Sequence, residues 1–161
     1  AGGCRSLAMT LSRRALLLAA AALPLARPGA AQDAPAIHVV VDPNCECCTA
    51  WVEHLRAAGL AVTVEEMYAG LLVALKAEKG IPLDLRSCHT AEAGGYVIEG
   101  HVPAPDILRL LAERPEALGI AVPGMPWGSP GMGPEEEREA YEVTLFRADG
   151  TRAVWTAYAA A

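Results

Sequence analysis

The chain has 161 residues, which is room for one domain. Its composition, 53% apolar and 20% charged, is typical of a globular protein and excludes a disordered one. Acidic residues exceed basic ones to give a net charge of −6, and the only lysines are Lys76 and Lys79, so no basic cluster indicates binding to nucleic acid or to an anionic membrane.

Residues 1–31 have the pattern of an export signal. The basic segment Ser12-Arg13-Arg14 precedes an apolar run from Ala15 to Leu25, and Gly29-Ala30-Ala31 supplies small residues for cleavage. A membrane anchor is the alternative, but spanning a bilayer takes about 20 apolar residues. The paired arginines fit both the general secretory and the twin-arginine routes. We therefore expect a single mature domain, residues 32–161, in the periplasm, where disulfides persist.

Strands and helices alternate along the first half of the mature chain. Short β-branched or alternating runs predict strands, and apolar residues three or four positions apart predict helices. The expected elements are a strand at Ile37–Val41, a helix at Cys47–Ala58, a strand at Leu60–Val64 and a helix at Tyr68–Lys79.

The second half begins with a predicted loop, Leu83–Gly95, and a short strand, Tyr96–Ile98. A helix is expected from Pro105. Residues 123–134 hold eight Pro or Gly residues in twelve positions, which excludes a regular element. The chain then predicts a C-terminal β-hairpin from 141 to 155, with a two-residue turn at Asp149-Gly150.

The first strand leads directly into Cys45-Glu46-Cys47-Cys48 at the start of a helix. A Cys-x-x-Cys in this place is typical of thioredoxin-like proteins. The sequence therefore predicts an α/β, thioredoxin-like fold, with a central mixed β-sheet flanked by helices and the hairpin at its end.

Four cysteines remain in the mature chain: Cys45, Cys47, Cys48 and Cys88. A helix N-terminus stabilises negative charge and so favours thiolates at Cys47 and Cys48. Clustered thiolates repel one another unless a cation is bound, and soft sulfur ligands favour Cu(I) and Zn(II). The alternative is a purely structural disulfide, which leaves one of the three clustered thiols of the Cys-x-Cys-Cys motif unpaired. Cys45–Cys48 can bridge one helical turn, a Cys47–Cys48 bond is strained, and Cys88 can pair with any thiol near it.

Two histidines and two methionines are further candidate ligands. His89 follows Cys88 and is either a ligand or a loop residue. In thioredoxin-like folds a cis-proline lies against the Cys-x-x-Cys, and by that analogy the residues before Pro103, among them His101, face the thiols. Met125 and Met132 offer thioethers, which select Cu(I) over Zn(II), although packing is the commoner role of Met.

Two other histidines are expected to have no role at the site. His54 lies outside the apolar stripe of its helix and is expected to be solvated. His38 begins a strand and is expected to be structural.

Several motifs in fixed order resemble the CopG-type family of exported metal-binding proteins associated with copper resistance. They are the segments 45–55, Gly80-Ile81-Pro82, Ser87-Cys88-His89-Thr90-Ala91, 95–104, 118–126 and Gly128-Ser129-Pro130-Gly131-Met132. The resemblance covers essentially the whole mature chain. It implies a thioredoxin-like fold, copper bound through the Cys-x-Cys-Cys motif and a further cysteine, and a periplasmic setting beside other copper-handling proteins. Glu46 departs from the glycine that is common in the family.

Carried over residue by residue, the resemblance implies a metal site from these residues: Cys45, Cys47, Cys48, Cys88, Met125, Met132, His89 and His101. The leading hypothesis is a periplasmic copper-binding protein that binds Cu(I), with several ions held by bridging thiolates and binding coupled to thiol redox chemistry. The alternatives are a thiol–disulfide oxidoreductase that uses Cys45–Cys48 and a structural Cys₄ zinc domain. The methionines favour copper over zinc, and the third thiol, Cys47, argues against simple oxidoreduction.

We predict that the chain is exported and cleaved near Ala31. Mass spectrometry of the protein recovered from a bacterial periplasm should show Gln32 or a close neighbour as its first residue. An intact chain in the cytoplasm would contradict this. Changing Arg13 and Arg14 together to Lys should block export only if the twin-arginine route is used.

Overall fold

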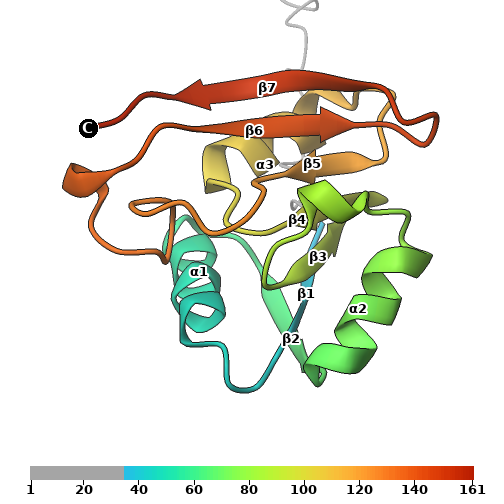
Figure 1. Ribbon diagram of the computed structural model, residues 1–161, viewed down its shortest axis with the longest axis horizontal. Helices are drawn as coiled ribbons and strands as arrows, with labels where there is room; N and C mark the ends of the chain where they lie inside the picture. The colour runs from blue at the N-terminus through green and yellow to red at the C-terminus, as the bar shows by residue number, and fades with distance from the viewer. Residues whose placement is uncertain (1–34) are drawn as a thin grey trace, which may run out of the picture. The chain divides into compact units, whose positions relative to one another are not determined.

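The computed structural model describes residues 35–161, so the predicted export signal lies outside the described residues. Seven strands form one sheet in the order β2-β1-β3-β4-β5-β6-β7 (Figure 1). The strands are β1 (Ile37–Val41), β2 (Val62–Glu66), β3 (Thr90–Ala93), β4 (Tyr96–Glu99), β5 (Gly119–Ala121), β6 (Tyr141–Phe146) and β7 (Arg152–Tyr158). The helices are α1 (Glu46–Ala57), α2 (Ala69–Glu78) and α3 (Ala104–Glu113), with short 3₁₀ turns η2 (Leu83–Leu85) and η3 (Glu135–Glu137). Within residues 35–161 no helix is both long and apolar enough to span a membrane.

The sheet is mixed because only two pairs of neighbouring strands, β1–β2 and β4–β5, are parallel. Strand β1 runs parallel to β2, which it reaches through α1, and β4 runs parallel to β5, which it reaches through α3. The pairs β1–β3, β3–β4, β5–β6 and β6–β7 are antiparallel. A parallel neighbour requires a crossover connection, so α1 and α3 follow from the pairing.

The two faces of the sheet are covered by different helices. The larger core lies on the side of α1 and α3, where Trp51 and Leu55 of α1 pack with Ile107 and Leu110 of α3. A smaller cluster on the other face consists of Ile81, Leu85, Val97, Ala121 and Phe146. Figure 1 shows α2 on the opposite side of the sheet from α1. Both faces are therefore buried in the middle of the sheet.

The helices and the mixed sheet agree with the prediction, but two strands were missed. Strand β3 lies inside the predicted loop Leu83–Gly95, and its Thr-Ala-Glu-Ala sequence carries no β-branched run. Strand β5 has three residues and begins with glycine. At Gly119 an added Cβ would lie 1.9 Å from the Val97 carbonyl oxygen, so glycine permits the close strand approach.

The C-terminal hairpin is present, but its turn differs from the prediction. Beyond the Phe146–Arg152 pair, the Arg147 N–H donates to the Thr151 carbonyl at 3.1 Å, and the Gly150 N–H donates to the Arg147 carbonyl at 3.0 Å. The loop is thus three residues long, with Gly150 in the left-handed region at φ +85°. A three-residue loop with glycine at this place is a common hairpin connection.

A buried ion pair joins α2 to the sheet. Lys76 Nζ lies 2.6 Å from Glu99 Oε1, and both side chains are almost completely buried. Thr90 donates to the second carboxylate oxygen, and the Ser87 N–H donates to the first at 2.6 Å. Burial raises the pKa of Glu99 and lowers the pKa of Lys76, and the contact between them opposes both changes. The carboxylate therefore fixes the backbone immediately before Cys88.

We predict that Lys76→Met destabilises the fold, because it leaves the Glu99 carboxylate buried without its cation. Breaking one side of a buried ion pair costs about 3–5 kcal/mol. Urea unfolding of the metal-free protein measures this. Adding Glu99→Gln should recover a large part of the loss, because the amide carries no charge and its oxygen still accepts from Ser87.

Lys79→Met is the matched control, since Lys79 forms a partly exposed pair with Glu92. Its cost should stay below about 1 kcal/mol. Equal effects of the Lys76 and Lys79 changes would contradict the importance of the buried pair.

Candidate metal centre

The Cys-x-Cys-Cys motif is fixed by the turn that follows β1. The Asp42 carboxylate accepts from the Asn44 N–H at 2.9 Å and from the Ala69 N–H, the first of α2, also at 2.9 Å. These bonds hold the pKa of Asp42 below its ordinary value, the Asn44 N–H contributing most. The Cys45 N–H donates to the Asp42 carbonyl at 3.0 Å, and Cys45 is the N-cap of α1. The turn thus aligns the cysteines on the first turn of α1.

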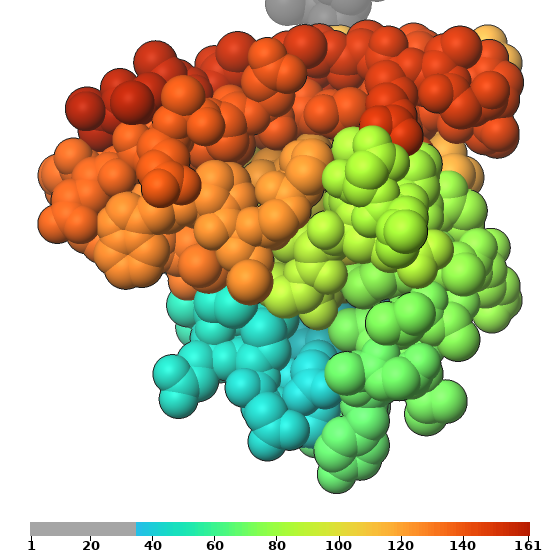
Figure 2. Space-filling view, viewed as in Figure 1, coloured from blue at the N-terminus to red at the C-terminus, as the bar shows by residue number. Residues whose placement is uncertain are grey.

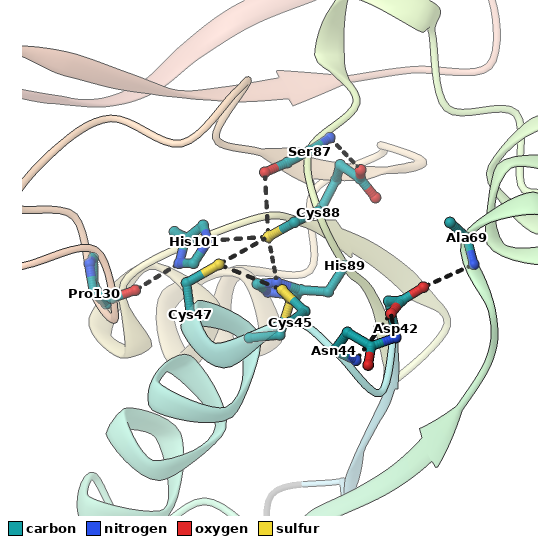
Figure 3. Close-up of a disulfide and its surroundings, with 12 residues drawn as sticks. Asp42, Asn44, Cys45, Cys47, Ala69, Ser87, Cys88, His89, His101 and Pro130 are labelled. Carbon is teal, nitrogen blue, oxygen red and sulfur yellow. Dashed lines mark hydrogen bonds between the residues drawn. A yellow bond between two sulfur atoms is a disulfide. The ribbon is translucent and has the colours of Figure 1, made fainter.

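The four mature cysteines come together from two distant segments. Cys45 and Cys48 form a disulfide, while Cys47 and Cys88 are free thiols (Figure 3). Cys47 Sγ lies 3.4 Å from Cys45 Sγ and 3.8 Å from Cys88 Sγ. All four sulfurs lie within 4.8 Å of one another. Of the pairings that the sequence leaves open, the bridge across one helical turn is the one present.

The strand register explains why Cys88 reaches α1. Val40, near the end of β1, pairs with Thr90 at the start of β3, and Thr90 pairs with Glu99 at the end of β4. Cys88 precedes β3 and His101 follows β4, so both lie at the edge of the sheet where α1 begins. The site is assembled at this edge.

Two buried imidazoles extend the sulfur cluster. His101 Nε2 lies 3.1 Å and His89 Nδ1 lies 3.2 Å from Cys88 Sγ. Neither histidine is exposed to solvent. Cys88, His89 and His101 form a second group whose ligand atoms lie within 4.8 Å of one another. Cys88 therefore belongs to both groups.

His101 presents a lone pair to the sulfurs. Its Nδ1 lies 2.7 Å from the Pro130 carbonyl oxygen, which can only accept, so Nδ1 carries the hydrogen. Burial lowers the pKa of His101, which favours the neutral ring. Nε2 is then unprotonated and faces Cys88. A ring nitrogen oriented by a backbone carbonyl through the other nitrogen is typical of metal-binding histidines.

His89 is neutral and incompletely hydrogen-bonded. Complete burial lowers its pKa well below the ordinary value. Its ring lies 4.2 Å from the Trp51 ring, centroid to centroid. Within the described residues, Nε2 is buried and has no hydrogen-bond partner. An unpaired buried polar atom is uncommon in native proteins and is consistent with a functional role for this ring.

Cys88 is protonated in the disulfide form. Burial, and next the neighbouring Cys47, raise the pKa of Cys88 to about 12. Its S–H has the His101 Nε2 lone pair as an acceptor. The thiolate expected at Cys48 requires the reduced protein, since Cys48 is bonded to Cys45 here.

The Pro/Gly-rich loop, residues 123–134, packs against α1 beside the site. A Cβ at Gly131 would lie 2.7 Å from the Trp51 backbone nitrogen and 2.8 Å from the Cys47 carbonyl oxygen. The loop therefore rests directly on the first turns of α1. Met132, beside Gly131, is half-buried, whereas Met125 is 53% exposed.

The segment before Pro103 faces the thiols, but through a different geometry from the one expected. The Trp51 Nε1–H donates to the Val102 carbonyl at 2.9 Å, which ties this segment to α1. Residues 35–161 contain no cis peptide bond, so the cis-proline analogy is wrong. Pro103 is instead the N-cap of α3.

The sequence reasoning missed several residues that position the site. His54, expected to be solvated, is half-buried, and its Nε2 accepts the Ala104 N–H at 3.2 Å. Gly100 has φ +73°, and an added Cβ would lie 2.6 Å from Ser87 Cβ and from the Val122 carbonyl oxygen. Only glycine fits there, and its place directly before His101 was the available signal. The roles of Trp51 and Pro130 depend on tertiary contacts and have no local signature.

The described residues can therefore hold a soft metal ion. A family model described as "Protein of unknown function, DUF411" matches residues 85–132, which include Cys88, both buried histidines and both loop methionines. No curated protein sequence matches.

This chain matches two solved structures over nearly their whole length. "Copper resistance protein copG- Form 1" is 43% identical over 78% of this chain and 98% of that chain, with a TM-score of 0.72. "Copper resistance protein copG- Form 2" is 44% identical over the same shares, with a TM-score of 0.71. At this identity and coverage, the chain belongs to the CopG family of copper resistance proteins.

Proposed function

We propose that this chain is a periplasmic copper-binding protein of copper resistance or homeostasis, which binds Cu(I) through Cys45, Cys47, Cys48 and Cys88. The observation that carries the proposal is the convergence of four sulfurs within 4.8 Å from two separate segments. Thiolate ligands favour Cu(I), and the solved relatives are described as copper resistance proteins.

The disulfide makes the ligand set depend on redox state. In the disulfide form Cys47 and Cys88 remain as thiols beside His101 Nε2. Reduction adds the sulfurs of Cys45 and Cys48, which completes the four-thiolate set. Copper binding is in this way coupled to thiol redox chemistry.

The overlap of the two ligand groups supports binding of more than one ion. Cys88 lies in the four-cysteine group and in the group with His89 and His101. A thiolate can bridge two Cu(I) ions, so Cys88 is the natural bridge. Met132 and Met125 act as peripheral thioether ligands on the loop that rests on α1.

The setting of the protein is proposed from the export-signal pattern of residues 1–31 and from membership of the CopG family. The mature domain is residues 32–161, exported to the periplasm, where it works with other copper-handling proteins and with neither nucleic acid nor membrane. A thioredoxin-like relationship is supported by the position of the Cys-x-x-Cys, after β1 and on the first turn of α1.

A thiol–disulfide oxidoreductase is the second candidate, because Cys45 and Cys48 are already bonded. It differs from the copper proposal in needing only these two sulfurs. Loss of Cys47 or Cys88 should leave such an activity largely intact, whereas it should impair copper binding.

We predict that the reduced, metal-free protein binds Cu(I) far more tightly than Zn(II). Each Cys→Ser change at the four positions should weaken Cu(I) binding sharply, because a soft ligand is lost. Met125→Leu and Met132→Leu should cost only about 1–2 kcal/mol, since volume is retained and one peripheral sulfur is lost. Competition with a chromogenic Cu(I) chelator measures the affinities.

The identity of the metal in freshly isolated protein distinguishes a copper site from a zinc site. If a Zn(II) chelator removes the metal while a Cu(I)-selective chelator releases nothing, the copper proposal is wrong and a Cys₄ zinc domain replaces it.

We predict that His101→Ala weakens Cu(I) binding by at least about tenfold, because it removes the nitrogen lone pair directed at Cys88. His38→Ala is the matched control, because His38 is partly exposed on β1 and faces Glu65 rather than the cysteines. Chelator competition on both variants checks this. Equal affinities for the two variants would show that His101 has no ligand role.

A further inference from the structure

The two sulfurs of the Cys45–Cys48 disulfide differ in accessibility. Cys48 is completely buried in the main core, whereas Cys45 is partly exposed. Cys45 lines a cavity of about 380 Å³ beside α2 and a second of about 330 Å³ beside Pro43 and Glu46, and Cys48 lines neither. Thiol–disulfide exchange requires an incoming thiolate to reach one sulfur, so only Cys45 can be attacked from solvent.

The larger cavity is a groove between α2 and the cysteine segments. Three of the four α2 residues that line it, Ala69, Leu72 and Val73, are apolar, and Cys45 and Cys88 lie along it; we call this the α2 groove. It is lined by Asp42, Asn44, Cys45, Ala69, Leu72, Val73, Lys76, Ser87 and Cys88. Figure 2 shows the surface of α2 in green beside the cyan surface of the α1 region.

The α2 groove offers no free cation to an incoming molecule. The Lys76 ammonium is buried against Glu99 and Thr90. The Asp42 carboxylate already accepts two backbone N–H groups. The carboxylates of a small anionic thiol such as glutathione would therefore find no free cation there, whereas an apolar protein surface matches the apolar side chains of α2.

Helix α2 continues this apolar surface outside the groove. Tyr68 and Leu71 are 71% and 65% exposed, and Val73, which also lines the groove, is 56% exposed. An exposed patch of this kind beside a reactive sulfur is typical of a protein contact site. The groove and the patch together fit a protein that presents a cysteine from an apolar rim.

We propose that the Cys45–Cys48 disulfide is the substrate of a protein dithiol that docks on the α2 groove and attacks Cys45 Sγ. A partner thiolate forms a bond to Cys45 Sγ, the Cys45–Cys48 bond breaks, and Cys48 leaves as a thiolate that takes up a proton. The second thiol of the partner, as a thiolate, then attacks the partner sulfur that is bonded to Cys45. This forms the disulfide of the partner and releases Cys45 as a thiolate, which takes up the proton. Two electrons pass from the partner, which becomes a disulfide, to this chain, which becomes a dithiol.

The consequence is control of the metal site. Exchange converts a site with two thiols into one with four, all at the edge of the sheet where α1 begins. This link to copper rests on the proposed function, whereas the exchange reaction itself does not.

Trapping of the mixed disulfide tests which sulfur is attacked. The probe is a thioredoxin whose second active-site cysteine is changed to serine, incubated with oxidised, metal-free Cys47→Ser protein, which lacks the thiol 3.4 Å from Cys45. After acid quenching and alkylation, peptide mass spectrometry should find the probe bonded to Cys45. A bond to Cys48, or no bond, would overturn the proposal.

A charge in the α2 groove tests where the partner docks. Val73→Glu should slow reduction by intact thioredoxin about tenfold, because docking would bury an unpaired carboxylate. Reduction by dithiothreitol, which needs no docking surface, should be unchanged. Val154→Glu is the matched control, since Val154 is 58% exposed on β7. The proposal fails if both variants behave like the wild type, or if Val73→Glu slows both reductants equally.

Neither measurement involves copper, so these failures concern the exchange reaction alone. Failure of the fully reduced protein to bind Cu(I) would instead overturn the proposed function.

Discussion

The antiparallel register of β1, β3 and β4 is the constraint on which the site depends. It places the end of β1, the start of β3 and the end of β4 at one edge of the sheet. Cys88 and His101, which are far from α1 in sequence, thereby meet the Cys-x-Cys-Cys motif. The buried Lys76–Glu99 pair reinforces the arrangement, because the Glu99 carboxylate also holds the Ser87 backbone. The ligands are thus positioned by the sheet rather than by flexible loops.

Burial gives the site its chemical character. His89 and His101 are buried and Cys88 is half-buried, which keeps the thiol protonated and both imidazoles neutral in the absence of metal. Neutral imidazole and thiolate are the forms that bind a soft cation, so binding must displace the Cys88 proton. The Pro130 carbonyl selects the His101 tautomer in advance, and only the Cys45–Cys48 bond withholds the remaining sulfurs. In the proposed function, redox state and metal occupancy are therefore two aspects of one site.

Much of this could be predicted from the sequence, and the rest depended on tertiary contacts. The cysteine cluster and the three helices have strong local signals in Cys-x-Cys-Cys and in apolar periodicity. Strands β3 and β5 were missed because they are short and rich in Ala and Gly, so their pairing depends on neighbours. The role of His54 at the start of α3 and the trans geometry before Pro103 were also outside local patterns. The Met125 and Met132 ligand roles stay predictions.

X-ray absorption at the copper edge, on reduced protein loaded with Cu(I), tests the central claim most directly, because it identifies the atoms bonded to the metal. The account predicts a first shell dominated by sulfur, which loses sulfur in the Cys47→Ser/Cys88→Ser double variant. A first shell made only of nitrogen and oxygen, unchanged by that double substitution, would contradict it.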